Sequence, residues 1–141
     1  MRLWHTDILP YLPRTQLLAQ WRELNSIFKK QDKHILINYI YSHDKGYLYD
    51  YSIMVIEQLK KRGYIIKSIR NFFHYFENYT NNISFQYFND FGKTFPEHDK
   101  EYMTICYWNL REKYLRGQKD FTKEIWDALE QFYQNYMKEG K

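Results

Sequence analysis

Cysteine, proline and glycine are scarce in this chain of 141 residues. Cys106 is the only cysteine, so no disulfide can form within the chain, and we expect a reducing compartment. Three prolines and five glycines leave no interior linker or low-complexity tract, which predicts a single domain over residues 1–141. No apolar run approaches the roughly 18 residues of a membrane span, and Asp7, Pro10 and Pro13 interrupt the amino-terminal segment. We therefore expect a cytoplasmic protein that does not contact a membrane.

Aromatic residues and positive charge are what the chain has in excess. Aromatic side chains make up 21% of the sequence, with 15 Tyr among them, and Tyr is suited to the rim of a core or to a binding surface. The mean hydropathy of −0.77 fits a core that is more aromatic than aliphatic. The formal net charge is +4 and the isoelectric point about 9.0. Such a chain is compatible with a polyanionic partner but does not require one.

Helical periodicity predicts an all-α fold of about five helices, with at most a minor strand pair. Apolar residues recur at the 3.6-residue spacing of a helix in five stretches. The first stretch follows Pro13, and the second begins near Asp44 and ends at Gly63. Pro96 is expected to open the fourth helix, and Asp120 to cap the fifth.

Three segments lack this period. Residues 1–12 are expected to be short and extended. Residues 34–41 are ambiguous between a short strand and a buried helical turn. Residues 80–95 are aromatic, rich in Asn and loop-like.

The common motifs for metals and cofactors are absent from the sequence. The histidines form no HExxH or His–x–x–x–His spacing, and one cysteine cannot form a CxxC pair. There is no glycine-rich nucleotide loop, no Walker loop and no GxSxG turn. Cys106 lies on a mostly apolar helical face, which indicates a core position rather than a nucleophile. We therefore expect no metal and no cofactor.

A polar ribbon follows one flank of the first helical stretch. At 100° per residue, Gln16, Gln20 and Glu23 share that flank with Ile27, whereas Arg22 lies on the opposite flank. The apolar face of the same helix is formed by Leu17, Leu18, Trp21, Leu24 and Phe28. Periodicity alone favours a solvated surface for an Arg–Glu pair in this position.

Basic and aromatic residues interleave along the chain. The basic residues cluster at 29–33, 60–62, 67–70 and 111–119. The aromatic residues near them include Tyr39, Tyr41, Tyr47 and Tyr49. Cations that neutralise phosphates and rings that stack on bases are combined in proteins that bind nucleic acids. Charges at helix carboxyl ends on a soluble surface explain the pattern equally well.

Three blocks of the sequence, in this order, resemble the pyrimidine-dimer DNA glycosylase/AP lyase family, the UV-damage enzymes of the endonuclease V type. The blocks are QLLAQWREL (16–24), IEQLKKRGYII (56–66), and PEHDKEYM with NLREK (96–113). The aromatic loop and the last helix do not match the family. The resemblance implies damaged double-stranded DNA as the partner and chemistry without metal or cofactor. We expect the protein to be a monomer.

The resemblance also implies a mechanism. The α-amine of the first residue attacks C1′ of the damaged nucleotide and forms an imine, and β-elimination then cuts the strand. Such an amine has a pKa of about 7.7–8.0, so a useful fraction is unprotonated near neutral pH. Glu23 matches the carboxylate that handles protons, Arg22 the phosphate-binding arginine, and Arg2 the basic residue after the terminus. Arg2 is too large for ordinary removal of the initiator, so the amine belongs to Met1 instead of the usual Thr.

The remaining predicted site residues are substrate contacts. Gln16 and Gln20 occupy positions where the characterised enzymes carry His and Glu. His34, in the pattern HxxxNY (34–39), either contacts a phosphate or base in the same cleft or is a hydrogen-bonded core histidine. The damaged nucleotide has to leave the base stack before the amine can reach it.

Three functions follow, in decreasing order of support from the sequence. The first is a DNA repair glycosylase with AP lyase activity. The second is a non-catalytic helical module that binds nucleic acid, which needs a basic surface but no free amino terminus. The third is a helical protein-interaction domain, which would show a contiguous exposed aromatic patch away from Glu23.

Overall fold

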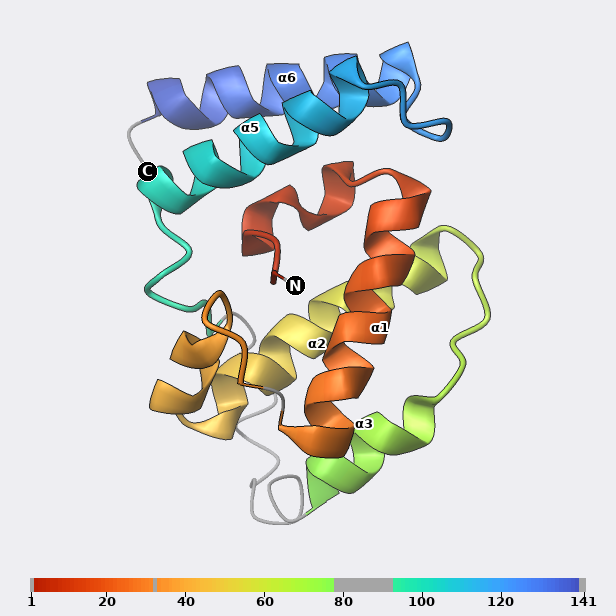
Figure 1. The fold of residues 1–141 in the computed structure, drawn as a ribbon, viewed down its shortest axis with the longest axis vertical. Helices are drawn as coiled ribbons and strands as arrows, with labels where there is room; N and C mark the ends of the chain where they lie inside the picture. Colours follow the sequence, from red (N-terminus) through yellow and green to blue (C-terminus); the bar gives the residue numbers. More distant parts are fainter. Residues whose placement is uncertain (1, 32, 78–92, 140–141) are drawn as a thin grey trace.

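The structure is a computed structural model that describes residues 2–31, 33–77 and 93–139, and every regular element in these ranges is a helix (Figure 1). The α-helices are α1 (Arg14–Lys30), α2 (Lys45–Lys61), α3 (Ile69–Tyr75), α5 (Lys100–Leu115) and α6 (Lys123–Lys138). Two 3-10 helices, η1 (Thr6–Tyr11) and η2 (Asn38–Ser42), precede α1 and α2. The predicted all-α class is confirmed, and these ranges contain no strand. Met1 and most of the predicted aromatic loop at 80–95 lie outside the described residues.

The ends of α2 follow the prediction. The Asp44 carboxylate caps α2 by accepting a hydrogen bond from Gly46 N–H at 2.8 Å. After the last turn, Gly63 takes a φ of +81°, the left-handed conformation that glycine adopts without strain.

The predicted starts of α5 and α6 are wrong. Asp99, not Pro96, caps α5, because its carboxylate accepts a hydrogen bond from a backbone N–H of the first turn. Thr122 caps α6 in the same way. The Asp120 carboxylate instead accepts a hydrogen bond from Thr15 N–H at 2.6 Å, at the start of α1. The Asp120 side chain therefore makes a contact between distant parts of the chain, whereas the local sequence pattern predicted that it would cap α6.

Two of the segments without clear periodicity form 3-10 turns. Residues 6–11 of the segment expected to be extended coil into η1, whose start is capped by His5 Nδ1 accepting from Asp7 N–H at 3.1 Å. The ambiguous stretch 34–41 overlaps η2, where Ile40 is buried. The helical alternative is therefore the correct one for its second half.

The helices form two groups with the amino-terminal segment between them. α1 packs against α2 and α3, whereas α5 pairs with α6 on the other side (Figure 1). Stacked rings join the second pair: the centroids of Tyr107 and Tyr133 lie 3.8 Å apart with a 6° interplanar angle. None of the helices in the described ranges is long and apolar enough to cross a membrane.

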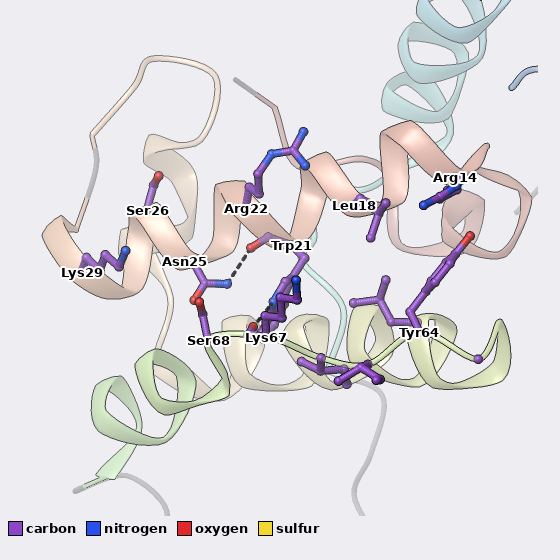
Figure 2. A pocket seen from close by; sticks show the side chains of 14 residues that line it. Arg14, Leu18, Trp21, Arg22, Asn25, Ser26, Lys29, Tyr64, Lys67 and Ser68 are labelled. Carbon is purple, nitrogen blue, oxygen red and sulfur yellow. Dashed lines mark hydrogen bonds between the residues drawn. The ribbon is translucent and has the colours of Figure 1, made fainter. Parts of the chain in front are cut away.

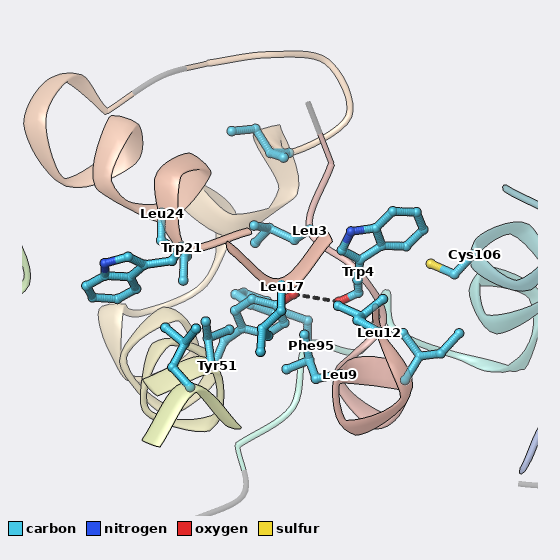
Figure 3. Close-up of a cluster of buried hydrophobic side chains, with 14 of the residues drawn as sticks. Leu3, Trp4, Leu9, Leu12, Leu17, Trp21, Leu24, Tyr51, Phe95 and Cys106 are labelled. Atoms are coloured by element: carbon cyan, nitrogen blue, oxygen red, sulfur yellow. Dashed lines mark hydrogen bonds between the residues drawn. The ribbon is translucent and has the colours of Figure 1, made fainter. Parts of the chain in front are cut away.

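The amino-terminal segment lies inside the core. Leu3 is fully buried and Trp4 only 6% exposed, among side chains of α1, α2 and α5 (Figure 3). The buried residues labelled around them include Leu9, Leu12, Leu17, Trp21, Leu24, Tyr51, Phe95 and Cys106. Leu3 and Trp4 therefore lie in the middle of the molecule, beside α1.

Candidate active site

A hollow of about 340 Å³ lies where the amino-terminal segment, α1 and α5 meet. Four predicted site residues line this Glu23 hollow: Arg2, Gln16, Gln20 and Glu23. The other lining residues are Trp4, Ala19, Leu36, Asn109 and Lys113. The α1 residues meet there because intervals of four and three residues place side chains on the same side of a helix. The shared flank predicted from the sequence is confirmed.

Gln20 fastens the amino-terminal segment to α1. The residue is 1% exposed. Its Oε1 accepts a hydrogen bond from Trp4 N–H at 2.7 Å, and its Nε2 donates to the Arg2 carbonyl at 3.2 Å. One amide side chain thus supplies both the acceptor and the donor that a neighbouring strand would offer to an extended backbone. Gln20 therefore holds this segment one helical turn from Glu23.

The first three described carbonyls are each held by a different helix. Gln20 of α1 donates to the Arg2 carbonyl. The Tyr102 hydroxyl of α5 donates to the Leu3 carbonyl, and the Tyr51 hydroxyl of α2 donates to the Trp4 carbonyl at 2.7 Å (Figure 3). Burial raises the pKa of both tyrosines, so both remain hydroxyl donors. We call Gln20, Tyr51 and Tyr102 the carbonyl clamp.

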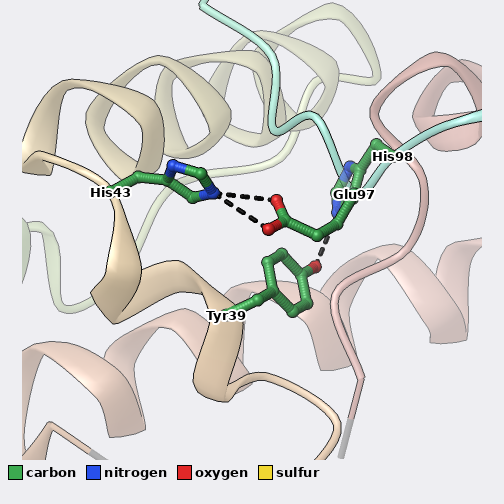
Figure 4. Close-up of polar contacts among 4 residues, drawn as sticks. All are labelled: Tyr39, His43, Glu97 and His98. Carbon is green, nitrogen blue, oxygen red and sulfur yellow. Dashed lines mark hydrogen bonds and ion pairs between the residues drawn. The ribbon is translucent and has the colours of Figure 1, made fainter.

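A histidine extends this anchoring to Thr6. His98 Nδ1 accepts a hydrogen bond from Thr6 N–H at 3.1 Å, which leaves the ring proton on Nε2, 2.6 Å from the Tyr39 hydroxyl (Figure 4). Burial, and secondarily the His5 ring, lower the pKa of His98 to about 3. Next to it in sequence, Glu97 pairs with His43 at 2.9 Å. The neutral His98 therefore joins η2, the start of α5 and the amino-terminal segment.

The Glu23 hollow carries more positive than negative charge. Glu23 is half-buried, and the other charged lining residues are Arg2 and Lys113. The Arg2 guanidinium lies 5.9 Å from the centroid of the Tyr102 ring, within cation–π range. Two cations beside one carboxylate favour an anionic ligand such as a phosphate.

Gln16 lies on the side of this hollow that faces the loop before α6. Its Nε2 donates to Gln118 Oε1 at 2.9 Å, and Gln118 Nε2 in turn donates to Asp120 at 2.9 Å. Gln16 thus has a protein partner and also lines the hollow.

Arg22 lies on a second hollow, of about 750 Å³, on the other flank of α1 (Figure 2). The divergence of Arg22 and Glu23 was predicted by their spacing. Four cationic side chains line the second hollow: Arg14, Arg22, Lys29 and Lys67. Its apolar lining includes Leu18 and Trp21, and Trp21 Nε1 donates to the Lys67 carbonyl at 2.8 Å. No carboxylate is among the described residues that line it.

His34 lies on the surface and does not line either hollow. Its Nδ1 accepts a hydrogen bond from Leu36 N–H at 3.2 Å, and Leu36 lines the Glu23 hollow. The interpretation of His34 as a core histidine is therefore wrong. Tyr39, from the same HxxxNY pattern, reaches His98 instead.

Cys106 is fully buried, which confirms the predicted core position. Its Sγ accepts a hydrogen bond from His5 N–H at 3.4 Å, and burial raises the pKa of the thiol to about 11. No cluster of three metal-ligating His, Cys, Asp or Glu side chains occurs among the described residues.

Five lining residues of the Glu23 hollow were not predicted for the site, and two of these five come from α5. Asn109 and Lys113 belong to α5, one turn apart. In the sequence both residues belong to the block NLREK (109–113), and Lys113 also belongs to a basic cluster, but neither was assigned to the site. Their approach to Glu23 depends on the packing of α5 beside the amino-terminal segment.

Comparison with known proteins gives one family. The family model described as pyrimidine dimer DNA glycosylase matches residues 1–71, which include η1, α1, η2 and α2. No curated protein and no solved structure matches the chain.

Proposed function

This chain belongs to the pyrimidine dimer DNA glycosylase family, and we propose that it is a DNA repair glycosylase with AP lyase activity. In this proposal the Met1 α-amine attacks C1′ of the damaged nucleotide as the base leaves, and an imine joins the protein to the sugar. Removal of a proton from the sugar then expels the 3′ phosphate by β-elimination. Glu23 moves protons in these steps and stabilises the cationic intermediate.

One observation carries the proposal: the amino-terminal segment is held against α1 on the side that presents Glu23. Gln20 bonds the backbone of Arg2 and Trp4, and Glu23 follows Gln20 by three residues on the same side of α1. Arg2 itself lines the Glu23 hollow, and the proposal requires the α-amine of the residue before it to enter that hollow. Correct placement of a nucleophile supplies a large part of the rate in such a reaction.

The charged residues have separate roles in the proposed complex. Arg2 and Lys113 lie in the Glu23 hollow, where they neutralise phosphates beside the lesion. Arg22 contributes a phosphate contact from the second hollow, on the other flank of α1. Gln16 and His34 are proposed as outer contacts, since Gln16 lines the hollow and the exposed His34 accepts a hydrogen bond from Leu36, which also lines it. Gln20 acts through the backbone that it holds.

The test of the role of Glu23 is the variant Glu23→Gln, which keeps the size of the side chain and removes its charge. We expect strand cutting at an abasic site to fall by at least about 100-fold, a typical contribution of acid–base catalysis, with duplex affinity retained. Glu124→Gln makes the same change on an exposed residue of α6 and should leave cutting unchanged. Wild-type cutting by Glu23→Gln would show that Glu23 has no such role.

The alternative is a non-catalytic module that binds nucleic acid. The second hollow favours it, because four cations, with no carboxylate among the described lining residues, can bind phosphates whether or not an amine reacts. Acetylation of the amino terminus separates the two functions. The glycosylase predicts that acetylation abolishes cutting and leaves binding intact, whereas the module predicts that there is no cutting to abolish.

A further inference from the structure

Three large apolar side chains are exposed on the solvent face of α5. Ile105, Trp108 and Leu115 are 43%, 53% and 62% exposed. They recur at intervals of three and seven residues, so they form one stripe, which we call the α5 ridge. The inner face of α5 is covered: Met103, Cys106 and Leu110 are buried, and Tyr107 stacks on α6.

The α5 ridge continues the wall of the Glu23 hollow. Ile105, Asn109 and Lys113 follow one another at intervals of four residues and form one row along the helix. Asn109 and Lys113 line the hollow, and Ile105 is the exposed end of their row. Trp108 lies in the adjacent row, three residues after Ile105. A large ligand that covers the mouth of the hollow therefore meets the ridge.

Positive charge accompanies the ridge. Trp108 and Leu115 border a shallow depression of about 480 Å³ together with Arg111, Glu112 and Arg116. The Arg111 guanidinium lies 5.0 Å from the centroid of the Trp108 ring. Glu112 is the one carboxylate among the described lining residues, and Arg116 neutralises it at 2.9 Å. The depression keeps a net positive charge next to an exposed indole.

This combination fits DNA better than a second protein. A guanidinium beside an exposed aromatic face suits phosphates and unstacked bases. Three side chains form too small an apolar surface for a stable dimer, which buries about 800 Å² on each partner. Proteins that kink DNA commonly place an apolar side chain against the opened base step.

We propose that the α5 ridge is a second contact for the duplex that occupies the Glu23 hollow, with Trp108 packed against a base or sugar beside the lesion. This inference rests on the proposed function, because the duplex reaches the ridge from that hollow. The ridge would hold the opened step next to the lesion, while Arg111 neutralises the adjoining backbone.

The test uses a duplex that carries tetrahydrofuran, an abasic analogue that cannot form an imine. Trp108→Ala should lower the affinity for this duplex by about 5- to 100-fold, the range for loss of one base–aromatic contact. Trp108→Phe should restore most of it. Phe73→Ala removes an aromatic side chain that is 61% exposed on α3 and should leave the affinity unchanged. Borohydride trapping of an abasic duplex by the wild type is measured in parallel, as the readout of the lyase.

The position of Trp108 along the DNA is determined with the fluorescent base 2-aminopurine, placed in turn at each base that flanks the tetrahydrofuran. Binding of the wild type should change the 2-aminopurine fluorescence on one side of the lesion, and binding of Trp108→Ala should not. If Trp108→Ala and the wild type bind the duplex with equal affinity, the ridge contact is overturned. It is also overturned if the wild type is a dimer and Trp108→Ala is a monomer with the same affinity for DNA. Absence of duplex binding by the wild type overturns both proposals. Absence of trapping alone, with weakened binding by Trp108→Ala, overturns the lyase and supports the ridge.

Discussion

Removal of the Gln20 side chain tests whether the carbonyl clamp positions the reacting end of the chain. Gln20→Ala deletes the acceptor for Trp4 N–H and the donor to the Arg2 carbonyl. It also removes the acceptor for the Tyr51 hydroxyl at 3.0 Å, although that hydroxyl keeps the Trp4 carbonyl as a partner. A buried group that loses its partner costs about 1–3 kcal/mol. Because Trp4 N–H and the Arg2 carbonyl both lose their partners, we expect the free energy of unfolding to fall by about 2–6 kcal/mol, measured by urea denaturation.

The same variant should also react slowly when it is folded. Release of the Arg2 carbonyl lets the terminus move, and a displacement of about 1 Å can cost about 100-fold in rate. The assay is single-turnover borohydride trapping at saturating abasic DNA, at a temperature where the variant is folded.

A destabilised control separates position from stability. Leu129 is fully buried in α6, and Leu129→Ala should cost about 2–5 kcal/mol without touching the clamp. Its trapping rate should remain that of the wild type. If Gln20→Ala also traps at the wild-type rate, Gln20 only stabilises the fold, and the reasoning about position is refuted.

Two further predictions concern pH and charge. The folded pKa of His98 is about 3, below the unfolded value of about 6.5, so the unfolded chain binds the extra proton between these values. The contribution of the neutral His98 to the free energy of unfolding is therefore fully present above about pH 6.5 and is lost as the pH drops. In urea denaturation from pH 7 to 4, the wild type should lose up to about 1.4 kcal/mol per pH unit more than His98→Gln. Parallel curves for the two proteins would contradict this. Arg22→Ala should weaken binding to damaged and undamaged duplex alike and reduce the slope of log affinity against log salt by about 0.9, with trapping at saturation unchanged. An unchanged slope would remove Arg22 from the phosphate contacts.

The sequence predicted what depends on local pattern. The 100° spacing places Gln16, Gln20 and Glu23 on one flank of α1 and Arg22 on the other, and the two hollows follow that division. The end of α2 just before Gly63 was predicted, because a glycine that follows a basic last turn is a signal within the local sequence.

Contacts between distant parts of the chain were not predictable in this way. Asp120 bonds Thr15 instead of capping α6, since the loop before α6 packs on the start of α1. The partners of Gln20 are backbone atoms of residues 2–4, and backbone atoms leave no signature in a sequence. Lys113 reaches the Glu23 hollow only because α5 packs beside the amino-terminal segment.

The most direct test of the central claim is to map the covalent bond. Untagged protein with a free terminus is incubated with a duplex that carries an abasic site, reduced with borohydride and digested, and the modified peptide is identified by mass. The proposed mechanism predicts an adduct on the α-amine of Met1, formed much more slowly by Glu23→Gln. An adduct on a lysine, or none at all with the amine shown to be free, would contradict it.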